Sequence, residues 1–456
     1  MYIEQLYTNC LAEAAYYIES EGEVAIIDPL RETTPYLEKA QAANASIKYV
    51  FETHFHADFV SGHIDLAKKT GAQIVYGPKA DTAYEVYNAK DGEKFKLGKL
   101  TIEALHTPGH TPESTCYLLY DENGKEHAIF TGDTLFVGDV GRPDLLDGVM
   151  TKEELAGMMY DSLRNKIMPL ADDIIMYPAH GPGSACGKNI GKETFSTIGE
   201  QKQSNYALQQ MTKDEFIAKV TDGMLPPPKY FFEDAKINKL GYSNIDEVLE
   251  QNQTALSLEE FKDLKQHGAL VLDTRIPNDF EKGFIEGSIN IGLNGQYAVW
   301  VGTLIDIKQP IILITDDQTE EQAVLRLARV GYENVKGYLK GGIESWDEPL
   351  DTITSIEPAQ ISDFDSATVV DVRKPGEFAN GHVKDATFVT LSGMPENIKQ
   401  LDKEETYLIH CAGGYRSMIA ASMMKAEGFK NPINVYGGFG KIKETDIAIE
   451  SELAEA

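Results

Sequence analysis

Cysteine is scarce in this chain of 456 residues. Its four cysteines, Cys10, Cys116, Cys186 and Cys411, are scattered and form no Cys-x-x-Cys pair. In a chain of this length such a distribution argues against a disulfide framework and favours a reducing compartment. We therefore expect the protein to reside in the cytoplasm.

Long apolar runs and basic charge are also lacking. No uninterrupted apolar stretch approaches the roughly 20 residues of a membrane helix, and the start, Met1 to Leu6, lacks the basic and apolar regions of a signal peptide. We expect neither a membrane anchor nor a leader. With 72 acidic against 42 basic residues, the formal net charge is −30. A field of this sign repels nucleic acid and anionic membranes, so neither is an expected partner.

Enough apolar residues are present for ordinary cores, since the hydrophobic fraction is 42%. The length predicts about three domains. Because the chain is so acidic, an anionic substrate would have to be bound by locally placed cations and backbone amides.

The motif Cys411-Ala412-Gly413-Gly414-Tyr415-Arg416-Ser417 follows the apolar run 407–409 and opens a helix-like segment, 417–428. At such a junction, free backbone N–H groups and the helix dipole stabilise a thiolate and nearby anions. A buried cysteine in a glycine-rich turn is the plain alternative for the motif alone.

The motif resembles that of the rhodanese sulfurtransferases, whose six-residue cradle suits a sulfur atom carried on cysteine. Four flanking segments occur in the family's order: Asp371-Val372-Arg373, Glu377-Phe378, Gly381-His382-Val383 and Gly437-Gly438. The resemblance implies that Cys411 is catalytic and carries sulfane sulfur. It also implies that Arg416 and the N–H groups of Gly413 and Gly414 hold an anionic substrate.

An internal repeat precedes this motif. Asp273-Thr274-Arg275 lies 98 positions before Asp371-Val372-Arg373, and Phe280 and Gly283 keep the same offset from Phe378 and Gly381. We therefore predict two copies of one α/β unit, at 256–350 and 353–456.

The first copy differs where the chemistry would take place. Asp316-Asp317 stands where the second copy has Cys411, and Phe284 stands in place of His382. A carboxylate cannot carry sulfane sulfur, and two carboxylates repel an anion. We expect an inactive rhodanese-like domain that serves as a spacer or docking surface.

A connector is predicted at 226–255. Its three prolines favour an extended segment. The aromatic residues Tyr230, Phe231 and Phe232 would be costly to leave in water, so we expect the connector to be packed. The N-terminal domain is then predicted at 1–225.

Four polar clusters of the N-terminal domain each follow an apolar run, which is typical of metal ligands on loops at strand ends. They are Thr53-His54-Phe55-His56-Ala57-Asp58-Phe59, Thr107-Pro108-Gly109-His110-Thr111, Thr131-Gly132-Asp133-Thr134 and Tyr177-Pro178-Ala179-His180-Gly181. Imidazole and carboxylate together suit divalent transition metals. A lone histidine in a turn is more often structural, but four clusters in this order are typical of a metal site.

These segments resemble the metallo-β-lactamase fold, an αββα sandwich with a metal site at one edge. Dinuclear members read His-x-His-x-Asp-His, whereas the sixth position here is Phe59, which cannot bind a metal. This departure argues against a second metal. We interpret His63, four residues later, as a structural or surface helix residue.

The mononuclear branch of that fold is the persulfide dioxygenases. The resemblance implies one ferrous iron held by His54, His110 and Asp133, the facial triad of non-haem oxygenases, with zinc as the alternative. The residues His56, Asp58 and His180 would then orient ligands and hydrogen-bond the substrate. Spacing leaves open whether His56 or His180 binds the metal directly.

Other residues of the N-terminal domain are weaker candidates. Arg142 is a contact for a substrate carboxylate or a surface salt bridge. Cys186 is a relay thiol or a small residue in a tight loop, and Cys10, in an early turn, is a candidate to face the pocket. Cys116, in a strand-like run, is interpreted as a core residue.

The three domains together resemble the fused persulfide dioxygenase–sulfurtransferases of bacterial sulfide detoxification. This implies that a low-molecular-weight persulfide, of glutathione or coenzyme A, reacts with O2 to give sulfite and thiol. Cys411 would pass sulfane sulfur to sulfite and form thiosulfate. The alternatives are a zinc-dependent thioesterase of the glyoxalase II type fused to a sulfurtransferase, and a non-catalytic sulfane-sulfur carrier. The resemblance suggests a homo-oligomer, although no residue indicates the oligomeric state.

Overall fold

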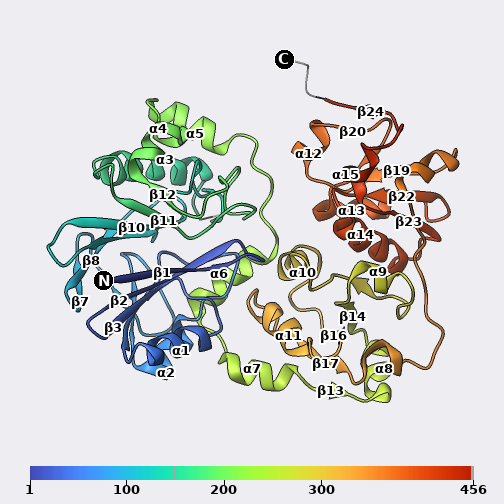
Figure 1. Ribbon diagram of the computed structural model, residues 1–456, viewed down its shortest axis with the longest axis horizontal. Helices are drawn as coiled ribbons and strands as arrows, with labels where there is room; N and C mark the ends of the chain where they lie inside the picture. The colour runs from blue at the N-terminus through green and yellow to red at the C-terminus, as the bar shows by residue number, and fades with distance from the viewer. Residues whose placement is uncertain (147–148, 453–456) are drawn as a thin grey trace. The chain divides into compact units, whose positions relative to one another are not determined.

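The computed structural model describes residues 1–146 and 149–452, and the chain divides into two compact units (Figure 1). The first contains Met1–Glu247 and the short segment Ala328–Gly331. The second contains Val248–Leu327 and the chain from Tyr332 onward. Among the described residues, no helix has both the length and the apolar character needed to cross a membrane.

Two six-stranded sheets form the centre of the first unit. In spatial order, the first contains β1 (Tyr2–Thr8), β2 (Glu13–Ser20), β3 (Glu23–Ile27), β4 (Ser46–Phe51), β5 (Gln73–Tyr76) and β6 (Tyr87–Asn88). The second contains β12 (Ser196–Thr197), β11 (Ile175–Pro178), β10 (Glu126–Gly132), β9 (Thr115–Tyr120), β8 (Leu100–His106) and β7 (Lys94–Leu97).

Side-chain alternation along β2 shows how the layers form. Tyr16 and Ile18 pack with Phe130 of the second sheet, so they lie between the two sheets. Tyr17 points the other way and packs with Tyr36 of α1 (Thr34–Ala42). This period of two is expected of a strand that is buried on both faces.

Helices cover the outer faces of both sheets. The first sheet packs against α1 and α2 (His63–Thr70), and the second against α3 (Lys152–Ser162), η1 (Leu163–Ile167), α4 (Ile198–Ser204), η2 (Tyr206–Leu208) and α5 (Lys213–Thr221). The predicted αββα sandwich is therefore confirmed.

Reciprocal hydrogen bonds define the starts of several helices. The hydroxyl of Thr151 accepts from the N–H of Glu154, whose carboxylate accepts from the N–H of Thr151, and α3 begins there. The pairs Thr197 with Glu200 and Thr212 with Glu215 start α4 and α5 in the same way. A Thr-x-x-Glu pattern satisfies two N–H groups that the helix itself leaves free.

The predicted connector is partly helical. It contains α6 (Tyr230–Leu240) and α7 (Ile245–Asn252), and α6 lies in the first unit. Tyr230 and Phe231 are buried, in line with a packed connector, but Phe232 is 44% exposed. The three prolines precede the helix without secondary structure of their own. The predicted boundaries 1–225 and 226–255 stay predictions.

The second unit contains two five-stranded sheets whose strand pairs are parallel. In spatial order, the first contains β13 (Ala255–Leu256), β17 (Val335–Leu339), β16 (Ile311–Ile314), β14 (Leu270–Asp273) and β15 (Ile289–Asn290). The second contains β18 (Ser355–Ile356), β23 (Asn431–Val435), β22 (Thr406–His410), β19 (Thr368–Asp371) and β21 (Thr387–Phe388). A small pair, β20 (His382–Val383) and β24 (Ile449–Glu450), flanks it.

The two sheets repeat one another in strand order and in side-chain detail. Arg275 binds both carboxylate oxygens of Asp273 and the carbonyl of Gly283. Arg373 makes the same bonds with Asp371 and Gly381. The Asp-x-Arg repeat of the sequence is thus a buried ion pair that holds the chain beyond the strand.

The helices of the second unit surround these sheets. They are α8 (Leu258–Gln266), α9 (Pro277–Phe280), α10 (Tyr297–Leu304), α11 (Glu320–Ala328), η3 (Gly342–Ser345), η4 (Pro358–Asp363), α12 (Pro375–Ala379), η5 (Leu391–Gly393), α13 (Met394–Asn397), η6 (Ile398–Gln400), α14 (Tyr415–Ala426) and α15 (Gly438–Ile442). The last four residues of the predicted domain 353–456, residues 453–456, lie outside the described part of the chain.

Candidate functional site

The candidate metal-binding residues of the first unit lie on loops that follow strands of both sheets. His54, His56 and Asp58 follow β4, His110 follows β8, Asp133 follows β10 and His180 follows β11. Each of these side chains is at most 5% exposed. The loop positions therefore gather residues that are far apart in the sequence into one buried cluster.

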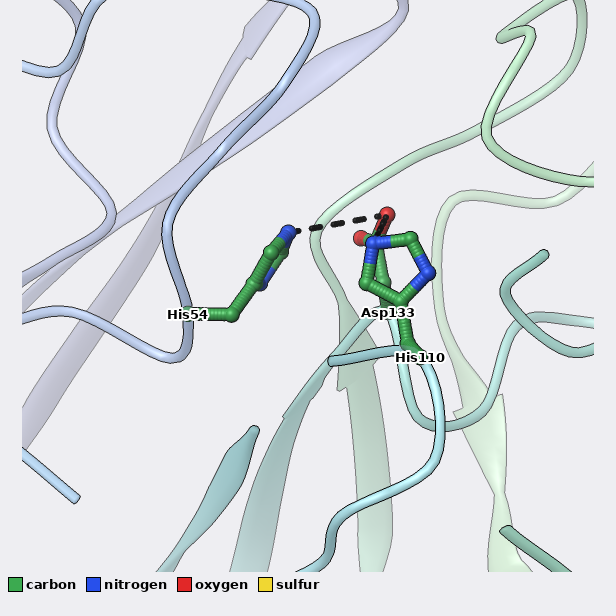
Figure 2. Close-up of side chains that lie close together, drawn as sticks. All are labelled: His54, His110 and Asp133. Atoms are coloured by element: carbon green, nitrogen blue, oxygen red, sulfur yellow. Dashed lines mark ion pairs between the residues drawn. The ribbon is translucent and has the colours of Figure 1, made fainter. Parts of the chain in front are cut away.

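His54, His110 and Asp133 face one another (Figure 2). Oδ2 of Asp133 lies 3.8 Å from Nε2 of His54 and 3.4 Å from Nε2 of His110. Atoms bound at about 2 Å to one ion are separated by similar distances. The three residues predicted to hold the metal are thus brought together by the fold.

Each imidazole is oriented through its other nitrogen. Nδ1 of His110 donates to the carbonyl of Arg142 at 2.7 Å. Nδ1 of His54 lies 2.9 Å from the hydroxyl of Thr53, which donates its own proton to Asp28 and so accepts from the imidazole. In both rings Nε2 is thus the nitrogen directed into the cluster, as a metal ligand requires.

The donor set fits a divalent cation. Within the described residues, neither Nε2 of His54 and His110 nor either carboxylate oxygen of Asp133 has a hydrogen-bond partner. Four buried, unsatisfied atoms in one place are costly unless something binds them. Burial, reinforced by the neighbouring imidazoles, lowers the pKa of His54 well below its usual value. The ring is therefore neutral, as metal binding requires.

A second group, His56, Asp58 and His180, adjoins the first. Nε2 of His180 lies 3.4 Å from Oδ2 of Asp58 and 3.6 Å from Oδ1 of Asp133. Although burial acts against it, the carboxylates of Asp58 and Asp133 raise the pKa of His180. His56 directs Nε2 toward Asp28 at 3.1 Å. Of His56 and His180, either of which could bind the metal directly, His180 is therefore the nearer to Asp133. The roles of His56, Asp58 and His180 stay predictions.

Phe59 fills the place of a further ligand. Its side chain is fully buried, and its ring centroid lies 4.3 Å from that of His56. A benzyl group offers no donor atom. The fold therefore leaves the second group without the ligand that the dinuclear pattern would put at this position.

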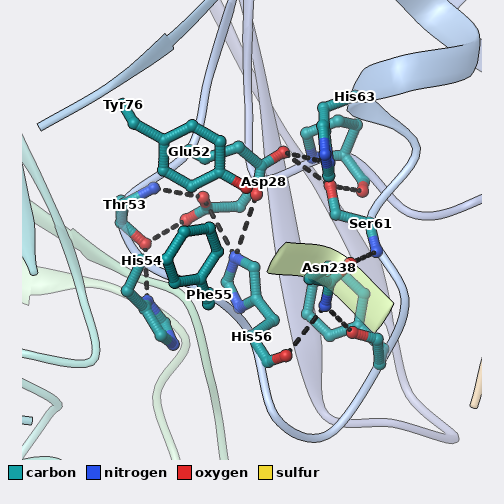
Figure 3. Close-up of polar contacts among 12 residues, drawn as sticks. Asp28, Glu52, Thr53, His54, Phe55, His56, Ser61, His63, Tyr76 and Asn238 are labelled. Carbon is teal, nitrogen blue, oxygen red and sulfur yellow. Dashed lines mark hydrogen bonds and ion pairs between the residues drawn. The ribbon is translucent and has the colours of Figure 1, made fainter. Parts of the chain in front are cut away.

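Residues that sequence reasoning missed hold the metal-binding loop (Figure 3). Oδ1 of Asp28 accepts from the N–H of Thr53 at 2.7 Å. Glu52 accepts from the hydroxyl of Ser61 at 2.5 Å and lies 3.6 Å from Nε2 of His56. Asp28 follows the apolar strand β3, the same signal that revealed the other clusters, and it could have been found in that way.

Asn238 of α6 binds the same loop. Its amide nitrogen donates to the carbonyls of His56 and Phe59, both at 2.8 Å, and its oxygen accepts from the N–H of Ser61 at 2.9 Å. His63 is buried and bonds through Nε2 to the hydroxyl of Tyr84 at 2.7 Å, which makes it structural. No local sequence pattern could have identified Asn238, because it lies 182 positions from His56.

Cys411 of the second unit lies between β22 and α14. Its thiol is 1% exposed and accepts from the N–H of Gly414 at 3.1 Å, and it lies 3.6 Å from the hydroxyl of Ser417. Gly414 has φ of +105°, a conformation that favours glycine. An added Cβ at Gly413 would meet no atom within 4 Å, so this part of the loop is open.

Comparison with known proteins identifies both kinds of domain. The profile of the metallo-beta-lactamase superfamily matches residues 8–180. That of the rhodanese-like domain matches residues 257–349 and 358–445. A structure of a metallo-beta-lactamase from Staphylococcus aureus subsp. aureus COL, 32% identical, covers 75% of this chain and 99% of that one, with a TM-score of 0.66. The chain belongs to the metallo-β-lactamase superfamily. It joins that fold to two rhodanese-like domains.

Relatives of the metallo-β-lactamase domain include two activities. Human persulfide dioxygenase ETHE1 is 30% identical over 213 residues, which cover 45% of this chain and 74% of that protein. The probable hydroxyacylglutathione hydrolase glo2 of Schizosaccharomyces pombe is 35% identical over 159 residues, 34% of this chain. The chain spans only 58% of the length of that hydrolase.

Arg142 of the metallo-β-lactamase domain is fully engaged. Nε and Nη2 bind Asp144 at 2.7 and 2.8 Å, and Nη1 and Nη2 donate to the carbonyls of Ala185 and Leu225. A substrate carboxylate would have to displace Asp144. Contact of this guanidinium with substrate stays a prediction, whereas its carbonyl orients His110.

The remaining cysteines of the metallo-β-lactamase domain differ in setting. Cys186 lies within ligand distance of Asp133 and His180, and burial raises the pKa of its thiol to about 12. The thiol of Cys10 accepts from Arg329, a residue of the segment Ala328–Gly331, at 3.7 Å. Cys116 is buried in β9, in line with a core residue.

Arg416 of the second rhodanese-like domain is also paired. Its Nη1 and Nη2 bind the two carboxylate oxygens of Glu377 at 2.7 and 2.8 Å. The hydrogen bond and charge of Arg416 keep the pKa of Glu377 below its usual value, although burial opposes this. The cradle therefore contains an ion pair rather than an isolated cation.

Proposed function

We propose that this protein is a persulfide dioxygenase joined to a sulfurtransferase. A low-molecular-weight persulfide, of glutathione or coenzyme A, reacts with O2 and water to give sulfite, thiol and protons. The observation that carries the proposal is the buried set of His54, His110 and Asp133 beside a position filled by Phe59. Two imidazoles and one carboxylate form the facial triad of non-haem ferrous oxygenases.

The metal is proposed to be a single ferrous ion, held by His54, His110 and Asp133. When bound, it would supply a centre where the persulfide sulfur and O2 can react. Similarity to persulfide dioxygenase ETHE1 supports a metal that can react with O2.

In this reaction the protein orients the metal ligands and encloses the site. Thr53 and the carbonyl of Arg142 keep the ligand nitrogens of His54 and His110 directed into the cluster. The cluster is almost fully buried, so bulk water is kept from the reacting sulfur. His180 and Asp58 lie beside Asp133, where they can hydrogen-bond the substrate or bind the metal.

Cys411 is proposed to carry out the second step. Its thiolate attacks the outer sulfur of a second persulfide, the sulfur–sulfur bond of the donor breaks, and the donor thiolate leaves. Sulfite then attacks the sulfur carried on Cys411, which frees the Cys411 thiolate and yields thiosulfate. The N–H of Gly414 stabilises the thiolate in both steps. The scarcity and scatter of the cysteines in the sequence support a reducing compartment such as the cytoplasm.

A thioesterase of the glyoxalase II type is the second candidate. The observation that favours it is the group His56, Asp58 and His180, which adjoins Asp133 and could help to hold a second ion such as zinc. Similarity to the glo2 hydrolase points the same way.

Oxygen uptake by anaerobically iron-loaded protein separates the two candidates. With glutathione or coenzyme A persulfide, we expect uptake that depends on iron, and sulfite or thiosulfate in the same vessel. The zinc-loaded protein should hydrolyse S-lactoylglutathione slowly or not at all. Absence of uptake with both persulfides, together with rapid thioester hydrolysis, would establish the second candidate instead.

A further inference from the structure

Tyr415 links the Cys411 motif to the first rhodanese-like domain. Its hydroxyl donates to the carbonyl of Gly292 at 2.7 Å. In the sequence it stands between Gly414, whose N–H reaches the thiol of Cys411, and Arg416. A displacement of Tyr415 would therefore be transmitted to the N–H group that contacts the sulfur of Cys411.

A glycine makes room for the tyrosine ring. A Cβ added to Gly295 would lie 2.4 Å from Cζ and 2.6 Å from Cε2 of Tyr415. Real Cβ atoms do not approach so closely, so even alanine would force the ring to move. Gly295 is not among the glycines with positive φ. The requirement for glycine here is therefore one of space alone.

The loop that receives the ring, residues 292–295, is itself held in place. Arg326 of α11 donates through Nη1 to the carbonyl of Leu293 at 2.5 Å and through Nη2 to that of Gly295 at 2.7 Å. Just before the loop, the N–H of Asn290 donates to the hydroxyl of Ser422 on α14. Arg326 and Asn290 are both buried, so the groups that hold the loop are fixed within the fold, although the accepting residues Leu293 and Gly295 are half-buried.

We propose that the first rhodanese-like domain forms part of the sulfurtransfer site, because its loop 292–295 positions Tyr415 and, through it, the cradle of Cys411. The domain would then do more than the spacing or docking expected from its Asp316-Asp317 sequence. Gly295, Tyr415 and Arg326 are positioning residues, since they act through the cradle. The inference rests on the proposed role of Cys411 in sulfur transfer.

The test is a double-mutant cycle on the full chain, read by the reactivity of Cys411. Iodoacetamide labelling of the Cys411 peptide, followed by mass spectrometry from pH 5 to 10, gives the rate constant and its pH midpoint without any sulfur donor. We expect Gly295→Ala to slow labelling at pH 7 by about fivefold, the loss of roughly one hydrogen bond to the thiolate. In the Tyr415→Ala background, the same substitution should add no further change.

Two further variants keep the result interpretable. Gly376→Ala is the matched control, since its added Cβ meets no atom within 4 Å, and it should label like the parent protein. Tyr415→Phe removes only the bond to Gly292 and should slow labelling by a smaller factor, whether or not Gly295→Ala folds. Equal effects of Gly295→Ala in both backgrounds would overturn the proposal, as would unchanged labelling in Gly295→Ala or in Tyr415→Phe.

Sulfur transfer from glutathione persulfide to sulfite is measured in parallel. If the parent protein transfers no sulfur but the cycle gives the expected coupling, the proposed function fails while the positioning of Cys411 stands. If transfer proceeds and coupling is absent, the positioning fails alone.

Discussion

At the scale of single residues, the chemistry depends on groups that are already hydrogen-bonded or ion-paired within the protein. The lone pairs of His54 and His110 are directed by bonds at the opposite ring nitrogen. Arg142 and Arg416, the two cations predicted to meet anions, each bind a carboxylate. Charge near each site is thus arranged in pairs, in a chain whose net charge is −30.

Glu377→Gln should strengthen the binding of anionic acceptors at Cys411. The change frees the charge of Arg416, while glutamine can still accept from the N–H of Lys374 at the start of α12. Because Glu377 is partly exposed, the expected effect is modest, a fall in the KM for sulfite of about two- to fivefold. Steady-state thiosulfate formation at varied sulfite measures it. An increase in KM would show that the ion pair itself shapes the cradle.

At the scale of secondary-structure elements, helices distant in sequence hold the loops that carry the chemistry. Helix α6 follows the triple proline and brings Asn238 against the metal-binding loop. Within the second unit, α14 begins at Tyr415, where the first rhodanese-like domain contacts it. Loop geometry therefore depends on packing as much as on the motif itself.

Asn238→Leu should loosen the metal-binding loop. It leaves the buried carbonyls of His56 and Phe59 without their donor, which costs about 2–5 kcal/mol in the free energy of unfolding. Metal affinity should fall about 10- to 100-fold, as for other residues that orient ligands. Urea unfolding and metal titration measure the two effects. Lys236→Ala, an exposed change on the same helix, should alter neither.

A loss of stability in Asn238→Leu without a loss of metal affinity would separate the two effects. It would show that α6 supports the fold of the first unit but not the geometry of the ligands.

At the scale of the whole molecule, two proposed reactions share one chain. The first unit would form sulfite, and Cys411 of the second unit would consume it. Each unit has its own core and its own candidate site. The two half-reactions should therefore be separable by changes that affect one site only.

Cys411→Ser should leave oxygen uptake largely unchanged, because the candidate metal ligands lie in the other unit. Sulfite should accumulate in place of thiosulfate, since a hydroxyl cannot carry sulfane sulfur. Uptake and both products are measured in one vessel, with Cys116→Ala as a cysteine-removing comparison. Loss of uptake in Cys411→Ser would mean that sulfur passes through Cys411 before it is oxidised.

Removal of the metal should have the opposite effect to Cys411→Ser, because it should stop oxygen uptake and spare sulfur transfer. A chelator leaves the buried atoms of His54, His110 and Asp133 without a cation, so the first unit should unfold at a lower temperature. Oxygen uptake should stop, while transfer of sulfur from persulfide to added sulfite continues. Calorimetry measures the unfolding temperature, oxygen consumption measures uptake, and a thiosulfate assay measures sulfur transfer. Loss of sulfur transfer on chelation would link the metal to the second site.

The sequence by itself determined the repeated α/β unit and the four polar clusters, which depend on short local patterns: apolar runs and the polar loops that follow them. The αββα sandwich and the set of His54, His110 and Asp133 were implied by resemblance of those clusters to known families. The Asp-x-Arg repeat likewise corresponds to a bond between neighbours in sequence.

Only the tertiary structure decided which charged groups are paired with a protein carboxylate and which residues distant in sequence are in contact. Asn238 lies 182 positions from His56, and Tyr415 lies 123 positions from Gly292. Neither contact leaves a periodic or local signal, because each is set by how whole elements pack. The pairing of Arg142 and of Arg416 was hidden for the same reason, since a sequence shows a charge but not the partner that neutralises it.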